Sequence, residues 1–335
     1  MLKTTDRSTA QSQMNALGKD RRPFLFLIDF EMERPVVLPL SEVDPKTLLY
    51  AIGGHRNCGL PLPVPAHYYY KPHPIPRPRY RTAFEYVQRE LQAGNSYLLN
   101  LAFPTPITTD LSLKQLFQIS QAPFRIWARG QFTCFSPEPF VRITADGEIA
   151  SFPMKGTIDA TLPAAREQLL ANPKEKAEHA TIVDLIRNDL SMIARQVRVN
   201  RYRYVEEIAT QQGNLLQTST EVRGQLPAHF HAQLGDLIFQ LLPAGSISGA
   251  PKQKTVSIIQ AAEQQKRGYY TGVCGLFDGQ RVDSGVMIRF IEQTRQGLVF
   301  KSGGGITARS HMPDEYEELL HKARLPFAPV TELAL

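Results

Sequence analysis

Residues 123–152 read PFRIWARGQFTCFSPEPFVRITADGEIASF and contain two strand-like segments in succession, 123–135 and 139–152. The dipeptide Asp146-Gly147 in the second segment is typical of a hairpin turn, because both residues tolerate the backbone angles that such a turn needs. Further strand-like segments come in similar runs, and the helical segments between them are irregularly spaced. This order differs from the strict alternation of parallel α/β proteins, so the sequence predicts an α+β fold with large antiparallel or mixed sheets.

The chain divides into three parts by composition. Residues 1–22 are polar and predict a loose tail. Residues 23–74 form an N-terminal region in which FLFLIDFEMERPVVLPL (24–40) predicts two strands around a turn, with apolar residues on both faces. Seven of the 25 prolines lie within 61–80, which predicts an extended crossing rather than a helix or a central strand. Residues 75–330 form the main body.

The main body mixes helices and strands. Thr82 and Glu85 form a capping-box pattern that predicts the start of a helix. A longer helical segment covers 164–195, with a break near Asn172-Pro173. The other helices are expected at 231–241, from Pro251 and from Pro313, and the other strands at 96–103, 197–206, 215–223, 270–277, 283–292 and 297–302.

Charge and cysteine content exclude several classes of protein. Lys and Arg number 38 against 32 Asp and Glu, and this net charge of +6 without a basic block is only weak evidence for nucleic acid as a partner. No segment approaches the roughly 18 apolar residues of a membrane span, and the first residues lack the apolar core of a signal peptide. The three cysteines are scattered without a CxxC motif, which predicts a protein of the reducing cytoplasm without disulfides or a zinc site.

Two pairs of glutamates share one spacing. Glu175 and Glu178 lie three residues apart in one predicted helix, and Glu315 and Glu318 do so in another. Residues at this spacing share a helical face, so each pair projects two carboxylates in one direction. If the two faces converged, the four charges would need a cation, and oxygen ligands without cysteine or clustered histidine favour Mg²⁺ over Zn²⁺. Two solvated helix faces are the alternative, and the spacing does not choose between them.

Three other features predict contact with a ligand, each with an ordinary structural alternative. Within 241–267, Pro251 and Lys252 begin a helix whose free N–H groups would form an anion site, unless the segment is only a tight turn before a helix. The glycines 303–305 would let backbone N–H groups approach a ligand, or form a plain turn. Lys155 in SFPMKGT is a candidate nucleophile, because partial desolvation favours the neutral amine, or else a surface charge.

Taken together, these segments resemble the chorismate-utilising family, which includes anthranilate, aminodeoxychorismate, isochorismate and salicylate synthases. The resemblance covers about residues 75–326 and rests on eight motifs in the family's order: FSPEPF, FPMKGT, AEHATIVDLIRNDL, LPAGSISGAPK, YYTGVCG, IRF, SGGGI and EYEELLHKA. It implies a two-part α/β sandwich of large, mainly antiparallel sheets with helices packed outside. It also implies that residues 23–74 are a shortened form of the family's N-terminal region, without its tryptophan-feedback element.

The resemblance implies a role for individual residues. Glu178 and Glu318 would be the principal Mg²⁺ ligands, and Glu175 and Glu315 would support them. Glu138 resembles the general acid that protonates the departing C4 hydroxyl of chorismate, which requires a carboxyl kept protonated by its site. The residues implied to bind the second carboxylate and the ring of the substrate are Tyr270, Arg289, Gly303, Gly304, Gly305, Lys322 and Ser248.

Lys155 decides between members of the family, because its motif resembles that of the aminodeoxychorismate synthases. There the lysine would add to C2 of chorismate as the C4 hydroxyl leaves, and ammonia would then attack C4 to give 4-amino-4-deoxychorismate. Leu98 stands near the position of the lysine that activates water in isochorismate and salicylate synthases, which disfavours the addition of water. Gln217 stands where the family often has histidine, and glutamine can orient a ligand but cannot carry a proton.

The resemblance also implies partners. The chain has no credible glutaminase site, so a separate glutamine amidotransferase subunit would deliver ammonia, and the product would supply 4-aminobenzoate and folate synthesis. Neither nucleic acid nor a membrane is expected as a partner. Two alternatives stay open at this point: an anthranilate synthase component I, and a chorismate-binding protein without catalytic activity.

Overall fold

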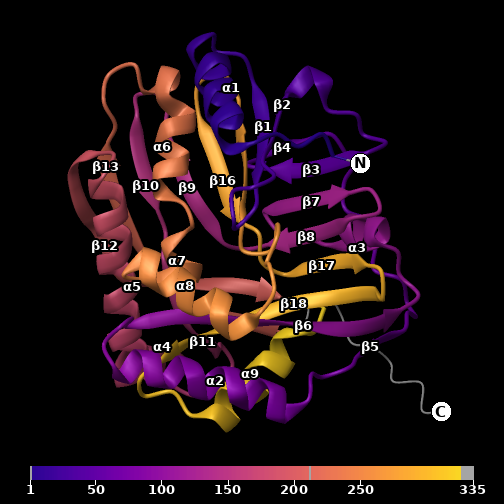
Figure 1. Cartoon of the computed structure of the whole chain (residues 1–335), viewed down its shortest axis with the longest axis vertical. Coiled ribbons are helices and arrows are strands. Elements are labelled where there is room, and N and C mark those ends of the chain that lie inside the picture. The colour runs from indigo at the N-terminus through magenta and orange to yellow at the C-terminus, as the bar shows by residue number, and fades with distance from the viewer. Residues whose placement is uncertain (1, 211–212, 326–335) are drawn as a thin grey trace.

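The computed structural model describes residues 2–210 and 213–325 and contains two nine-stranded sheets of antiparallel strand pairs (Figure 1). Helices cover the outer faces of these sheets, so the α+β class and the sandwich of mainly antiparallel sheets are confirmed. None of the helices within the described ranges is both long and apolar enough to cross a membrane. Residues 326–330, the end of the expected main body, lie outside the described residues.

Strands from distant parts of the chain form each sheet. The first sheet has the order β11 (Met154–Asp159), β13 (Gly213–Gln225), β10 (Glu148–Ser151), β9 (Pro139–Ile143), β16 (Val282–Val286), β15 (Val273–Phe277), β1 (Phe24–Ile28) and β2 (Val36–Pro39), with β12 (Arg195–Thr210) paired to β13. The second has the order β14 (Gly249–Ala250), β6 (Leu98–Thr109), β18 (Gly297–Thr307), β17 (Phe290–Thr294), β8 (Phe132–Ser136), β7 (Phe124–Ala128), β3 (Leu48–Ile52) and β4 (His55–Arg56), with β5 (Tyr70–Pro72) paired to β6.

The helices are α1 (Arg7–Lys19), α2 (Arg77–Gln92), α3 (Leu113–Ile119), α4 (Ala165–Ala171), α5 (Pro173–Ser191), α6 (Leu234–Leu241), α7 (Gly245–Ser248), α8 (Lys252–Glu263) and α9 (Met312–Lys322), with short 3₁₀ turns η1 (Leu40–Glu42) and η2 (Phe230–Gln233). The predicted helical segments correspond to α2, α4, α5, α6, α8 and α9, whereas α1, α3 and α7 were not predicted. The break between α4 and α5 falls at Asn172-Pro173, as predicted, because proline cannot continue the preceding helix.

The run 123–152 passes from one sheet to the other. Its first two strands, β7 and β8, form a hairpin in the second sheet, whereas β9 and β10 form a hairpin in the first. The predicted turn at Asp146-Gly147 connects β9 and β10, and Gly147 takes the positive φ of 84° that favours glycine there. Glu138 lies in the short connection between the two hairpins, which carries it to the junction of the sheets.

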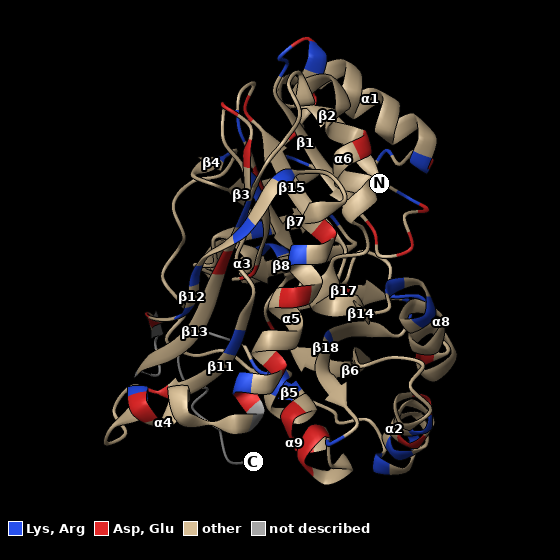
Figure 2. Ribbon diagram, turned by 90° about the vertical axis from the view of Figure 1, so that its left-hand side faces the viewer, with Lys and Arg blue, Asp and Glu red and all other residues tan. Residues whose placement is uncertain are grey.

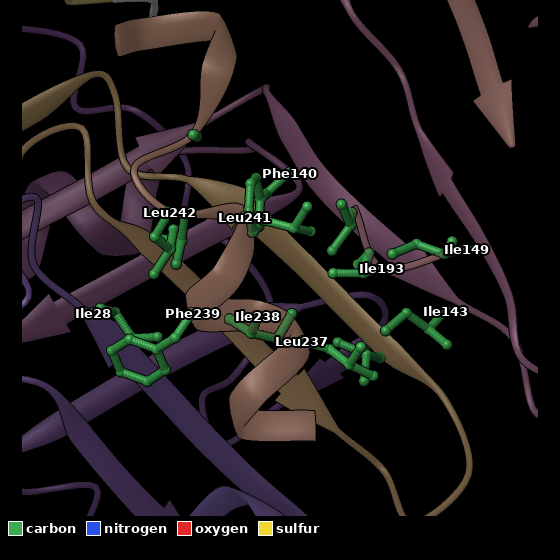
Figure 3. Packing of buried hydrophobic residues seen from close by; sticks show 14 of the residues in the cluster. Ile28, Phe140, Ile143, Ile149, Ile193, Leu237, Ile238, Phe239, Leu241 and Leu242 are labelled. Atoms are coloured by element: carbon green, nitrogen blue, oxygen red, sulfur yellow. The ribbon is translucent and has the colours of Figure 1, made fainter. Parts of the chain in front are cut away.

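Strand β1 is buried on both faces, as its sequence predicts. Phe24, Phe26 and Ile28 belong to a cluster that includes residues of α5 and α6, whereas Leu25 and Leu27 face strands of the second sheet. Figure 3 shows Ile28 in this cluster with residues of α6. Burying each such side chain stabilises the fold by about 1.5–3 kcal/mol relative to leaving it in water. The N-terminal strand is therefore an integral part of the core.

The first residues differ from the loose tail that the sequence predicts. They form α1, whose N-cap Asp6 accepts a hydrogen bond from the N–H of Thr9. Ala10, Met14 and Gly18, spaced by four residues, are buried where α1 packs on α6 and η2. One apolar residue per turn is a narrower stripe than the pattern of a typical amphipathic helix, which explains why the sequence does not reveal it.

Replacing Met14 by alanine is expected to lower the free energy of unfolding by about 2–5 kcal/mol, because the substitution leaves a cavity under α1. Urea unfolding followed by circular dichroism measures this change. The matched control is Met192→Ala, because the Met192 side chain is 50% exposed. Equal stabilities of the two variants would show that α1 is not packed against the body of the protein.

Helix α2 begins earlier than the sequence predicts. Pro76 occupies the N-cap and Pro78 lies in the first turn. Backbone N–H groups in the first turn of a helix have no partner within the helix, so proline loses no hydrogen bond there. Thr82 lies inside the helix, and its hydroxyl donates to the carbonyl of Pro78, so the predicted capping box is wrong. A capping box does occur at α3, between Ser112 and Gln115. The proline-rich crossing is extended up to this helix and includes the edge strand β5.

Candidate active site

A cavity of about 490 Å³ lies where the two sheets meet α5, α7 and α9. This volume falls within the range of small-molecule sites, about 300–1,000 Å³. It brings together all the site residues expected from the sequence except Gly304 and Ser248. They are Glu138, Lys155, Glu175, Glu178, Tyr270, Arg289, Gly303, Gly305, Glu315, Glu318 and Lys322.

The two glutamate pairs converge on this cavity. Figure 2 shows acidic segments of α5 and α9 close together, and Glu175, Glu178, Glu315 and Glu318 all line the same space. The alternative of two separate solvated faces is therefore wrong. Burial and the nearby charges of Glu315 and Glu318 raise the pKa of the Tyr80 hydroxyl, which lies in the core behind α9.

Basic and hydroxyl groups contact these carboxylates. Lys155 Nζ lies 3.3 Å from Glu178 Oε2, and Lys322 Nζ lies 2.6 Å from Glu318 Oε1. The Ser310 hydroxyl donates to Glu315 Oε1 at 2.7 Å. Within 2–210 and 213–325, no three Asp, Glu, His or Cys side chains are grouped as a metal site would need. The donor set itself, four carboxylates on two helices around one cavity, fits the oxygen chemistry of Mg²⁺.

Lys155 enters the cavity from an irregular part of β11. The register between β11 and β13 shifts between Met154 and Thr157, so Lys155 and Gly156 form a bulge. A β-bulge re-aims the side chains of its strand, and bulges are common beside active sites. On the opposite side of the cavity, a Cβ atom at Gly305 would lie only 3.0 Å from Lys155 Nζ. Glycine at this position therefore leaves room for the lysine.

Glu138 is fixed by two serines. Its backbone N–H donates to Ser136 Oγ at 3.1 Å, and Ser246 Oγ donates to its carboxyl oxygen Oε1 at 2.5 Å. Burial raises the pKa of Glu138 above its ordinary value, and this effect outweighs the opposing effects of Ser246, Lys155 and Lys322. A carboxyl group with a raised pKa can hold a proton and donate it to a leaving group.

Arg289 presents a positive charge to the cavity. Burial lowers the pKa of its guanidinium, with the neighbouring Tyr270 as the opposing influence, and no carboxylate of the described residues pairs with it. Its φ is 52°, a strained conformation for a residue with a side chain, and such strain is concentrated at functional sites. Lys322 Nζ donates to the carbonyl of Gly303 at 3.0 Å, which places a second cation beside the glycine run. These groups suit an anionic ligand.

Three residues lie differently from expectation. Ser248 is fully buried and donates to the carbonyl of Ala244, so Ser246 is the serine of this motif that faces the cavity. Gly304 is not part of the lining, although a Cβ there would lie 3.4 Å from Glu315 Oε2 and 3.7 Å from Glu318 Oε1. Lys252 pairs with Asp189 at 2.9 Å and donates to the carbonyl of Leu241, so it does not serve an anion site at α8.

Other lining residues matter for the interpretation. Leu98 and Gln217 both line the cavity. Leu98 stands near the position of the family's water-activating lysine, and Gln217 stands where the family often has histidine. Asn100, Ser246 and Lys301 also line the cavity and were missed by sequence reasoning. Of these three, Asn100 could have been found from the sequence, because it is a polar residue within the mostly apolar strand segment 96–103.

Comparison with known proteins shows the family of this chain. The family of chorismate binding enzymes matches residues 66–328. A Haemophilus influenzae protein named "Uncharacterized PabA-like protein" is 54% identical over 314 residues, 94% of this chain and 95% of the relative. Aminodeoxychorismate synthase component 1 of Escherichia coli is 34% identical over 260 residues, 72% of this chain, and the match spans only 55% of that relative.

A solved structure agrees with the fold. MenF, the menaquinone-specific isochorismate synthase from Escherichia coli, superposes with a TM-score of 0.71 over 96% of this chain and 82% of its own, at 16% identity. The eight motifs of the sequence therefore identify the family correctly. This chain belongs to the family of chorismate binding enzymes.

Proposed function

We propose that this protein is an aminodeoxychorismate synthase component I, which converts chorismate and ammonia to 4-amino-4-deoxychorismate and water. The observation that carries the proposal is the position of Lys155: its Nζ lies inside the cavity beside Glu178 and opposite Gly305. The similarity to aminodeoxychorismate synthase component 1 of Escherichia coli supports the same assignment. Because the matched segment covers 55% of that relative, its whole activity is a proposal for this chain.

The proposed reaction has two displacements. In the first, the neutral amine of Lys155 forms a bond to C2 while the bond between C4 and its hydroxyl breaks, and Glu138 donates a proton so that water leaves. The lysine nitrogen loses one proton in this step, which can restore Glu138. In the second, ammonia forms a bond to C4 while the bond from C2 to Lys155 breaks, and a proton from the incoming nitrogen returns to the lysine.

Binding of chorismate is assigned to the charged groups of the cavity. Arg289 and Lys322 attract one substrate carboxylate, and Tyr270 forms part of the wall next to Arg289. We propose that Glu178 and Glu318, supported by Glu175 and Glu315, hold Mg²⁺. When bound, this ion supplies positive charge for the other substrate carboxylate.

The alternative additions are less well supported. Leu98 lines the cavity near the position of the water-activating lysine of isochorismate synthases, and an aliphatic side chain cannot act as a base. Burial raises the pKa of the Cys274 thiol to about 12, and Cys134 is also buried, so neither supplies the thiolate that a glutaminase needs. The third cysteine, Cys58, is partly exposed and lies outside the cavity lining. We therefore propose that ammonia comes from a separate glutamine amidotransferase subunit.

A product assay tests this function. With chorismate, Mg²⁺ and an ammonium salt, the protein is expected to form 4-amino-4-deoxychorismate, identified by liquid chromatography and mass spectrometry. Removing the metal with EDTA is expected to abolish the reaction, and excess Mg²⁺ to restore it. Anthranilate as the product would support the component I of an anthranilate synthase instead. Tight chorismate binding without any product would support a non-catalytic binding protein.

A further inference from the structure

The carbonyl group of Lys155 lies outside the regular ladder between β11 and β13. Met154 pairs with Ser219 and Thr157 pairs with Gln217, so the two residues between them form the bulge. A buried backbone carbonyl needs a hydrogen-bond donor, and at a bulge the neighbouring strand does not supply its usual N–H. A side chain takes this role, because the hydroxyl of Thr218 donates to the carbonyl oxygen of Lys155. Thr218 is completely buried.

A second threonine on the same face of β13, Thr220, contacts helix α5, which carries Glu175 and Glu178. Thr218 and Thr220 point the same way because side chains alternate along a strand. Thr220 Oγ1 lies 2.5 Å from Nε2 of His179, a completely buried residue of α5 that directly follows Glu178. Thr220 also binds the chain just before the bulge, since its N–H donates to the carbonyl of Pro153 at 3.0 Å.

These contacts attach the segment that carries Lys155 and the segment that carries Glu178 to the same strand, β13. The bulge that carries Lys155 is held through Thr218, and the turn of α5 that carries Glu178 is held through His179 and Thr220. A glycine makes the close packing possible, because a Cβ at Gly156 would lie 3.1–3.4 Å from side-chain atoms of α4, Glu175 and Thr218. The separation between Lys155 Nζ and Glu178 therefore depends on β13 and not on the two side chains alone.

We propose that Thr218 is a positioning residue for Lys155: its hydroxyl replaces the missing ladder bond at the bulge, while the His179–Thr220 contact fixes α5 to the same strand. The inference rests on the proposed function, since it assigns Lys155 as the group that must be aimed. Misplacement of a reacting group by about 1 Å costs about 100-fold in rate. The loss of one hydroxyl at position 218 is thus expected to affect catalysis more than binding.

Kinetics of Thr218→Val test the inference. Valine keeps the shape of threonine, so kcat is expected to fall about 10- to 100-fold while the KM for chorismate stays within about twofold, because Arg289 and Lys322 lie on other elements. Thr218→Ser keeps the hydroxyl and is expected to recover most of the lost kcat. Should the valine variant fail to fold, Thr218→Ala removes the same hydroxyl without adding bulk at the site.

Thr133→Val is the matched control. Thr133 is also completely buried, and its hydroxyl donates to a backbone carbonyl, that of Ile126, at 3.2 Å in the β7–β8 hairpin of the other sheet. Its loss is expected to lower the melting temperature by a similar amount with an unchanged kcat. Equal kcat values for Thr218→Val and the native chain, or equal losses for the two valine variants, would overturn the proposal.

A chemical measurement separates this inference from the proposed function. The rate at which trinitrobenzenesulfonate labels Lys155 without chorismate, read by peptide mass spectrometry, is expected to change at least about threefold in Thr218→Val and not in Thr133→Val, since the reaction depends on the local placement of the amine. If Lys155→Ala kept full activity, the lysine adduct would be excluded, but the labelling result would still decide whether Thr218 places Lys155. An unchanged labelling rate would overturn the positioning role.

Discussion

Lys155→Ala is expected to form 4-amino-4-deoxychorismate at least about 100-fold more slowly than the native chain. The lysine is proposed to convert one difficult displacement at C4 into two easier ones, and alanine has no amine to form the adduct. Its Nζ lies 3.3 Å from Glu178 Oε2 and faces Gly305 across the cavity. Direct attack by ammonia would account for any remaining rate. The measurement is kcat at saturating chorismate and ammonium.

Two further variants separate nucleophilic catalysis from charge. Lys155→Arg keeps a positive charge near Glu178, but a guanidinium does not lose its proton in proteins, so this variant is expected to be as slow as the alanine variant. Lys266→Ala removes a lysine whose side chain is 67% exposed and which lies outside the cavity lining, and it is expected to be fully active. A Lys155→Arg enzyme with the native rate would show that only the charge matters.

Trapping the intermediate gives an independent measurement. With chorismate and Mg²⁺ but no ammonia, the native chain is expected to gain the mass of chorismate less one water on the peptide that contains Lys155. Adding ammonium is expected to discharge this adduct. An unchanged rate of product formation by Lys155→Ala would exclude the adduct altogether.

Local patterns explain which parts of the site could be predicted from the sequence. The glutamate pairs were predictable because the helical repeat alone decides that residues three apart share a face. The fold, and not the spacing, brings α5 and α9 together. Two glutamates on a solvated helix face have the same spacing in the sequence as two glutamates in a site. The family resemblance, which rests on eight ordered motifs, was needed to choose between these outcomes.

Contacts between distant segments explain the rest. Ser246 and Ser248 both flank Ile247, and only the packing of α7 decides which serine faces Glu138. The hydroxyl of Thr218 acts on a carbonyl 63 positions away, at a bulge that no strand pattern reveals. The helix α1 was missed for a related reason, since its narrow apolar stripe has meaning only against the surface of α6. In each case the role of the residue depends on a segment that is distant in the sequence, so the local sequence does not reveal it.

Glu138→Gln is the second variant with a large expected effect, a loss of about 10²- to 10⁴-fold in kcat. Glutamine keeps the size of the side chain and can accept the hydrogen bond from Ser246, but it has no proton to give to the departing hydroxyl. Glu33→Gln is the control, because the Glu33 side chain is 52% exposed and lies outside the cavity lining. Comparable rates for Glu138→Gln and the native chain would exclude Glu138 as the general acid.

The pH dependence of kcat/KM also tests the role of Glu138 as a general acid, because this role fixes the direction in which activity changes with pH. The active form of a general acid is protonated, so activity falls as the pH rises through its pKa. Burial raises the pKa of Glu138, so this descending limb is expected above the ordinary range of a glutamate. The hydrogen bond from Ser246 lowers that pKa, and Ser246→Ala is therefore expected to move the limb to higher pH. A limb that moves to lower pH, or stays in place, would contradict the assignment.

The stability of the Glu138→Gln variant distinguishes a lost proton donor from a damaged fold. Because the pKa of Glu138 is higher in the folded protein than in the unfolded chain, the folded state binds the proton more tightly. This contribution to stability is fully present below the unfolded pKa and is lost as the pH rises through the folded pKa. Above that window the carboxylate is buried with its charge, which glutamine lacks. The inactive variant is therefore expected to unfold at the same or a higher urea concentration than the native chain at neutral pH. A large destabilisation would assign Glu138 a structural role instead.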